Sequence, residues 1–482
     1  MPSLDTRAPA TVGAPAPPFV HPHRRRINLA LFAIGMATFA MLFSTQALLP
    51  DIATAFAVSP DQASWTVSAT TIGLALAVLP LSTLSERFGR ARLMTVSVAV
   101  ATALALLMPF APDLTSLIVL RALQGAAIAG IPASAVAYLS EELAARATVG
   151  AIGLFIAGNS VGGMSGRVLT GWVAEGAGWR AALAAVAGLA VVASLVFRLV
   201  LPKPRFFTPA SLRPRRVLAS VGGHLRRPLL LRLYAIGLLL MAAFSAVYTV
   251  IGFRLVAEPF GLSAGLAGSV FVIYLVGTVS SAVSGPLLDR LGRRGALYVA
   301  IGATVAGLLL TLTTSLAAVL AGLVLITGGF FFGHAVASGS VSRVATHGKA
   351  HASALYQVAY YLGASLGGTA GAAVYHRAGW AGLVSFALVA LVATAAITLY
   401  ATARARATAG APAGATRDAD PGARSGTPAG ARADIPAGAA SGAASGAVAS
   451  TAVASTGAGV PAGARAGAAS GAASELAPRL AA

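Results

Sequence analysis

Cysteine is absent from this chain of 482 residues, and charged side chains make up only 10% of it. The lack of cysteine excludes disulfides, thiolate metal sites and thiol catalysis. A soluble chain carries about 25% charged residues, so this one lacks the surface charge that keeps a protein in water. The sequence also lacks a phosphate-binding loop, a cluster of metal ligands and a nucleophile arrangement. We therefore expect no enzyme activity, no cofactor and no metal.

Apolar residues take the place of the missing charges. They make up 57% of the chain, and the mean hydropathy is +0.81. A membrane-spanning helix needs about 20 largely apolar residues. Twelve stretches meet this requirement, which predicts an all-α membrane protein in a lipid bilayer. They lie at roughly 27–49, 65–84, 92–110, 114–139, 148–173, 180–201, 229–250, 264–287, 296–313, 315–340, 351–373 and 380–402.

The distribution of charge predicts the orientation. Lys and Arg outnumber Asp and Glu by 34 to 14, for a net charge of +20. A nucleic-acid-binding protein gathers such charge in a stripe, whereas here it falls in short segments between apolar runs, as in membrane proteins. Most of these segments would lie on one side, including the linker 202–228. We therefore place both termini and this linker in the cytoplasm, and the protein in the cell (inner) membrane as a multi-pass monomer.

Three sequence matches at nearly the same offset indicate a duplication. Glu86 and Asp289 are 203 residues apart in copies of a charged loop, and Gly162 and Gly367 are 205 apart in similar glycine-rich stretches. An Ala-Gly-Trp triplet recurs 201 residues on, at 177–179 and 378–380. We predict two parallel six-helix repeats, as in many secondary transporters. The domains would be a disordered segment 1–26, a bundle 27–201, the linker 202–228, a bundle 229–402 and a disordered low-complexity tail 403–482.

The charged loop and two helical motifs carry a family resemblance. The loop resembles G-x-x-x-D-R-x-G-R-R of the major facilitator superfamily, with Ser82 and Glu86 as departures in the first copy. Arg121, Gln124 and Gly125 resemble its R-x-x-Q-G element. The stretch with Gly158, Asn159, Gly162 and Gly163 resembles the helix-five motif of drug:proton antiporters, with Asn159 where proline is usual. The segment from His334 to Ser338, with Tyr360, Tyr361 and Gly363 downstream, is similar to the YnfM-type group of bacterial inner-membrane permeases, and the resemblance to the superfamily covers residues 27–402.

The resemblance implies that the two loops form a latch, which closes the cytoplasmic side when the protein opens outward. A carboxylate there would be stabilised near a helix N-terminus, and Glu141 or Glu142 could pair with Arg90. The alternative is a solvated basic loop that only enforces topology. The residues of this gating motif are Glu86, Arg87, Gly89, Arg90, Asp289, Arg290, Gly292 and Arg293.

Five residues are candidates for substrate binding or coupling, namely Arg121, Gln124, Arg167, His334 and Asp51. Arg121 lies about two turns inside an apolar span, where an arginine costs at least ~2.5–3.5 kcal/mol, so we expect it to line the cavity or tune coupling. Arg167 is a similar case, and either arginine could instead reach the membrane interface. His334 could exchange protons or simply join two helices. Asp51 could act at the outer mouth or as an interface or capping residue.

These features favour a secondary transporter that exports a small organic solute or drug against proton entry. Uptake of a small organic anion is the alternative, because an arginine without an intramembrane carboxylate suits it. A membrane sensor or scaffold that does not transport is a third hypothesis. The sensor or scaffold would need a folded soluble domain, yet the only extra segment is the low-complexity tail. The transporter would have a small-molecule substrate and protons as its partners.

Overall fold

The computed structural model describes residues 23–209 and 214–409, and within these ranges the secondary structure is helical throughout. The segments that we predicted to be disordered, 1–26 and 403–482, lie mostly outside the described ranges. The N-terminal half contains α1 (Arg24–Leu42), α2 (Leu49–Ala55), α3 (Pro60–Phe88), α4 (Arg90–Leu107), η1 (Met108–Phe110), α5 (Leu114–Ile128), α6 (Pro132–Glu142) and α7 (Ala145–Val200). After α8 (Pro214–Leu225), the C-terminal half contains α9 (Pro228–Val256), α10 (Ala264–Ser269), η2 (Val270–Ile273), α11 (Tyr274–Ala282), α12 (Ser284–Leu310), α13 (Leu316–Val344) and α14 (Lys349–Ala409).

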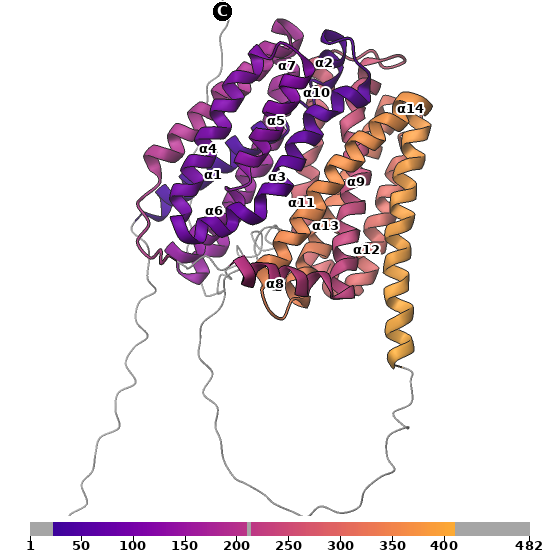
Figure 1. The fold of residues 1–482 in the computed structure, drawn as a ribbon. Helices are drawn as coiled ribbons and strands as arrows, with labels where there is room; N and C mark the ends of the chain where they lie inside the picture. The colour runs from indigo at the N-terminus through magenta and orange to yellow at the C-terminus, as the bar shows by residue number, and fades with distance from the viewer. Residues whose placement is uncertain (1–22, 210–213, 410–482) are drawn as a thin grey trace, which may run out of the picture.

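Ten candidate spans in the described residues are long and apolar enough to cross a membrane, and two of them cover two crossings each. The two are α7, with 56 residues, and α14, with 61. A straight helix of that length would exceed ~80 Å, far more than the ~30 Å of a hydrocarbon core. Each leaves helical geometry at one glycine, Gly178 in α7 and Gly379 in α14, and α14 doubles back in Figure 1. The architecture is therefore the all-α fold of twelve spans that the hydropathy predicts.

The duplicated motifs share a backbone conformation as well as a sequence. Gly89 and Gly292 of the charged loops have φ of +100° and +68°, and Gly178 and Gly379 of the Ala-Gly-Trp triplets have φ of +78° and +64°. A side chain would be strained in this left-handed region, so the turn needs glycine. In both halves the same two turns join the same pairs of spans.

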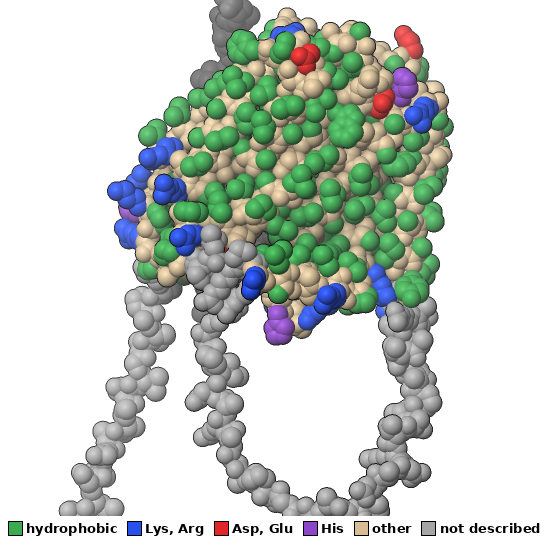
Figure 2. Space-filling view, viewed as in Figure 1, with side chains coloured by type: hydrophobic (Ala, Val, Ile, Leu, Met, Phe, Trp, Pro, Cys, Tyr) green, Lys and Arg blue, Asp and Glu red, His purple; other side chains and the backbone are tan. Residues whose placement is uncertain are grey.

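Each half has a core of its own, and small residues allow its helices to approach closely. In α7, a side chain at Gly158, Gly162 or Gly166 would collide with the backbone of α1. In α14, Gly363 and Gly367 meet the backbone of α9 in the same way. Such close packing is how apolar helices associate in lipid. Large apolar side chains on the outside remain exposed, and they cover much of the surface in Figure 2.

The two ends of the molecule differ in charge. Figure 2 shows Lys and Arg gathered mainly at the lower end, where α8 lies in Figure 1, whereas the visible Asp and Glu lie mainly at the upper end. We call these the basic end and the acidic end. The start of α1, the α3–α4 turn and α8 belong to the basic end, and the Gly178 turn belongs to the acidic end.

The two halves touch near the acidic end. There Trp172 Nε1 donates to Ser269 Oγ (2.9 Å), and Glu175 Oε2 accepts from Ser263 Oγ (2.8 Å) and Gly265 N (2.9 Å). Nearer the middle, the Ser68 and Thr369 hydroxyls lie 2.6 Å apart. Towards the basic end, a cavity of about 200 Å³ separates α3 and α6 from α14.

Candidate functional site

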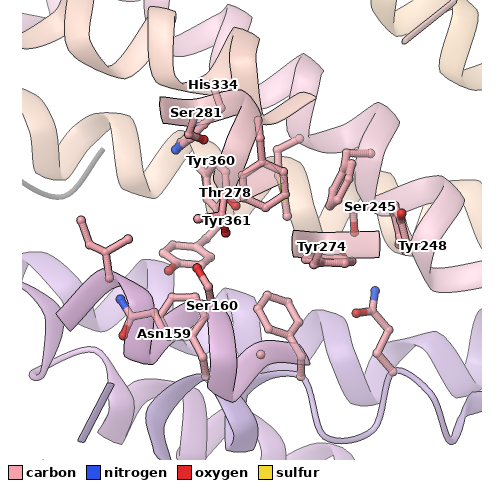
Figure 3. Close-up of a pocket in the computed structure, with 18 of the residues that line it drawn as sticks. Asn159, Ser160, Ser245, Tyr248, Tyr274, Thr278, Ser281, His334, Tyr360 and Tyr361 are labelled. Carbon is pink, nitrogen blue, oxygen red and sulfur yellow. The ribbon is translucent and has the colours of Figure 1, made fainter. Parts of the chain in front are cut away.

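A cavity of about 190 Å³ lies between the two halves and is lined by both. Figure 3 shows Asn159 and Ser160 on the N-terminal half, with the labelled tyrosines on the C-terminal half across from them. Two lining residues, Gln357 and Tyr361, also line the cavity towards the basic end, so the two spaces adjoin. The central cavity is lined by Phe39, Phe43, Gln46, Ile156, Asn159, Ser160, Gly163, Arg167, Met241, Phe244, Ser245, Tyr248, Tyr274, Thr278, Ser281, Phe331, His334, Gln357, Tyr360 and Tyr361.

Arg167 brings a positive charge to this cavity, and no Asp or Glu lines it among the described residues. The side chain is 1% exposed, so it does not reach the membrane interface. Its Nε donates to Gln46 Oε1 (2.7 Å) and its Nη1 to the Gly163 carbonyl (2.5 Å). These bonds use two of the five N–H donors of a guanidinium.

Aromatic rings surround the Arg167 guanidinium on several sides. Its Cζ lies 4.2 Å from the ring centroid of Phe43, 4.6 Å from that of Tyr274 and 5.0 Å from that of Phe271. All three distances are within the range of a cation–π interaction. Phe43 belongs to the N-terminal half and the other two to the C-terminal half. The charge is thus held without a carboxylate, at a point where the two halves meet.

His334 lies in the cavity wall on α13 and joins two helices. Its Nδ1 is 2.9 Å from the hydroxyl of Tyr356 on α14, and its ring lies 4.7 Å from that of Tyr360. The interhelical hydrogen bond is one of the two roles we considered for this residue. His334 also lines the cavity, and proton exchange, the second role that we considered, stays a proposal.

Arg121 does not line the central cavity, and this corrects the first of our two expectations from the sequence, whereas a role in coupling stays a prediction. The side chain is fully buried inside the N-terminal half, so it does not reach the interface either. Nη1 and Nη2 donate to the carbonyls of Met41 (2.6 Å) and Leu42 (2.5 Å), and Nε donates to that of Thr66 (2.9 Å). Met41 and Leu42 end α1, where carbonyls lose their helical partners. Arg121 therefore caps a broken helix.

Gln124 and Gly125 complete this capping arrangement. Gln124 Oε1 accepts from Arg121 Nη1 (2.7 Å), and its Nε2 donates to the Ala101 carbonyl on α4 (3.1 Å). A side chain at Gly125 would collide with the backbone of Thr70 on α3. The R-x-x-Q-G element thus ties α1, α3, α4 and α5 together. Gln124 does not line the central cavity, so its expected role in substrate binding is not supported by its position.

The helix-five motif has two faces. Gly158 and Gly162 pack against α1, whereas Asn159 and Gly163 face the central cavity. An asparagine in place of the usual proline puts an amide there. Gly158 and Gly162 therefore have a structural role in packing, whereas Asn159 and Gly163 remain candidates for substrate contact.

The two charged loops lie at the basic end and differ in their contacts. Arg90 Nε donates to Glu141 Oε1 at 3.1 Å, which is one of the two partners we considered. Glu142 instead accepts from the backbone N–H groups of Arg205 (2.7 Å) and Phe206 (3.1 Å). In the gating motif, Glu86, Arg87, Asp289 and Arg290 are exposed. The Arg90 contact lies within the N-terminal half, so it does not itself join the halves.

Asp51 is remote from the cavity. It lies half-buried in the first turn of the short helix α2, towards the acidic end. A carboxylate in a first turn is favourably placed for the helix dipole, although burial raises the pKa of Asp51 above its ordinary value. The N-cap of α2 is Leu48, and no side chain caps this helix, so the structure does not support a capping role for Asp51, and its role at the interface stays a prediction.

The sequence analysis missed most of the cavity wall. Gln46, Phe43, Phe244 and Tyr274 line the cavity, yet none of them stands out in an apolar span. Aromatic residues in such spans usually pack in a core. Helix α1 ends after Leu42, which brings Gln46 to the cavity, but residues 42–46 contain no proline or glycine from which this break could be predicted.

Comparisons with known proteins agree with this architecture. Residues 29–368 and 233–433 match the sequence profile of the Major Facilitator Superfamily. The chain is 38% identical to the uncharacterized MFS-type transporter YybF of Bacillus subtilis over 368 residues, covering 76% of this chain and 91% of YybF. It is also 38% identical to the inner membrane transport protein YnfM of Escherichia coli, covering 76% of this chain and 88% of YnfM.

A solved structure shows the same fold. The crystal structure of a bacterial homologue of the human lysosomal transporter Spinster, in an inward-facing and unoccupied conformation, superposes with a TM-score of 0.64. The two sequences are 18% identical, and the match covers 80% of this chain and 98% of that one. The chain therefore belongs to the major facilitator superfamily and is a multi-pass membrane transporter, not an enzyme.

Proposed function

We propose that this protein is a secondary active transporter that moves a small organic anion by alternating access. The observation that carries the proposal is Arg167, a buried guanidinium in the central cavity with three N–H groups free of described hydrogen bonds. A buried charge without a paired carboxylate is costly. An anionic substrate would supply the missing negative charge and the missing acceptors, and it would do so between the two halves.

The direction of opening follows from the charges and the contacts. The excess of Lys and Arg supports a cytoplasmic position for the basic end. The halves touch at the acidic end and are separated by a cavity towards the basic end, which supports an inward-facing conformation. Rocking of the two bundles about the central cavity would then expose Arg167 to the other side. We propose that the loops with Glu86 and Asp289 make their latch contacts only in that outward-facing state.

Transport by proteoliposomes tests the proposal. Purified protein would be reconstituted, and uptake of radiolabelled organic anions would be measured beside uptake of neutral and cationic compounds of similar size. Arg167→Gln should abolish anion uptake, because glutamine keeps hydrogen-bonding groups but not the charge. Arg198→Gln changes an exposed arginine and should have little effect. Equal anion uptake by Arg167→Gln and the unmodified protein would contradict the proposal.

Proton-coupled efflux of an organic solute or drug is a second candidate. It is favoured by His334, a titratable group that lines the cavity and is hydrogen-bonded to Tyr356, and by the helix-five motif. This function predicts that efflux of neutral or cationic compounds drives proton movement. His334→Gln should abolish this proton movement, whereas Arg167→Gln should retain it. The same reconstituted protein, with a pH-sensitive dye inside the vesicles, separates the two candidates.

A further inference from the structure

The two halves contribute different chemistry to the central cavity. The N-terminal half supplies the Arg167 charge with the amides of Gln46 and Asn159, together with Ser160. The C-terminal half supplies most of the aromatic rings, which form a wall, whereas the N-terminal half adds Phe39 and Phe43. The polar residues that line the cavity from the C-terminal half are Ser245, Thr278, Ser281, His334 and Gln357. The rings that line the cavity from that half are Phe244, Tyr248, Tyr274, Phe331, Tyr360 and Tyr361.

The aromatic wall is continuous from the charge to the histidine. Tyr274, which contacts the Arg167 guanidinium, lies 5.5 Å from Phe244 between ring centroids. Phe244 stacks on Phe330 at 4.0 Å, and Phe330 lies 5.9 Å from His334. Phe331 meets Tyr274 edge to face at 5.9 Å. Phe330 does not itself line the cavity, whereas Tyr360 does, and its ring lies 4.7 Å from that of His334.

We propose that the substrate is an aromatic carboxylate, whose carboxylate is held by the N-terminal half and whose ring is held by the C-terminal half. This inference rests on the proposed anion-binding role of Arg167. A flat ring gains from offset and edge-to-face contacts with aromatic neighbours, which a saturated ring of the same size does not make. A positive cavity also disfavours the cationic ligands that an aromatic wall alone would accept. The 190 Å³ volume suits a single ring with small substituents.

Such a substrate would bridge the two halves. Because its charged group and its ring contact different bundles, both contacts are complete only when the bundles are brought together around it. Phe331 is then a specificity-determining residue, since it lines the cavity from the C-terminal half and has no described contact with Arg167.

Isothermal titration of the purified full chain in detergent tests the inference, with benzoate, cyclohexanecarboxylate and benzyl alcohol as probes. Benzoate should bind about two- to tenfold more tightly than cyclohexanecarboxylate, the range that an aromatic contact provides. The saturated ring is the stricter control, because it is no less apolar. Benzyl alcohol keeps the ring without the charge and should bind most weakly. Phe331→Leu should reduce the benzoate preference, whereas Phe110→Leu, which changes a ring that is 80% exposed, should retain it.

The outcomes separate this inference from the proposed function. If both carboxylates bind equally and Arg167→Gln abolishes both, the anion site stands and the aromatic specificity is refuted. The aromatic specificity is also refuted if Phe331→Leu weakens both carboxylates by the same factor. If neither carboxylate binds, or if Arg167→Gln leaves their affinity unchanged, the anion site itself is refuted and the inference is refuted with it.

Discussion

Replacement of Arg121 by alanine should destabilise the N-terminal bundle rather than block transport in an otherwise intact protein. The Met41 carbonyl keeps a second donor in Ser44 Oγ, and the Thr66 carbonyl keeps one in Thr70 Oγ1. The larger losses therefore fall on the Leu42 carbonyl and the Gln124 side chain, which accept from Arg121. An unsatisfied buried polar group costs about 1–3 kcal/mol, so the two together give roughly 2–6 kcal/mol.

The melting temperature of the purified protein in detergent measures this loss. A unit of 150–250 residues loses roughly 2–4 °C per kcal/mol, so the variant should melt at least about 4 °C lower and accumulate less in the membrane. The melting temperature of Arg121→Lys should lie between those of Arg121→Ala and the unmodified protein, because an ammonium group cannot reach all the carbonyls that a planar guanidinium reaches. Arg198→Ala removes an exposed arginine and should change little.

One result would refute this reasoning. If Arg121→Ala has the abundance and melting temperature of the unmodified protein and yet fails to transport, the capping contacts are not what the residue is needed for. The expectation from the sequence, that Arg121 serves substrate movement directly, would then be right.

Three further predictions concern topology, packing and gating. A cysteine at Gly222 should resist an impermeant thiol reagent in intact cells while one at Ala177 reacts, and the reverse pattern would overturn the orientation. Gly125→Ala should lower the melting temperature because its side chain would collide with α3, whereas Gly153→Ala has open space around the added carbon and should be neutral or slightly stabilising; equal effects would contradict the packing role. Glu175→Ala removes a contact between the halves at the acidic end, so a cysteine in the central cavity should react faster from that side, and an unchanged rate would show that the contact does not hold the end closed.

The sequence by itself determined the number of spans and their duplication. Apolar length is decisive because a bilayer leaves a helix few alternatives. The repeated Ala-Gly-Trp triplets also mark a turn in each half, because Gly178 and Gly379 within them have positive φ angles. Charge bias predicts the orientation from the same local information.

The roles of the two buried arginines were decided only by the tertiary structure. In sequence, Arg121 and Arg167 look alike, each a single charge in an apolar span. What separates them is the break in α1 after Leu42, which offers carbonyls to Arg121 and places Gln46 beside Arg167. Helix breaks of this kind depend on contacts with other helices, and hydropathy does not record them. The aromatic wall beside Arg167 likewise arises from four helices that are distant in the chain, so only their packing could show that a charge and a set of rings share one cavity.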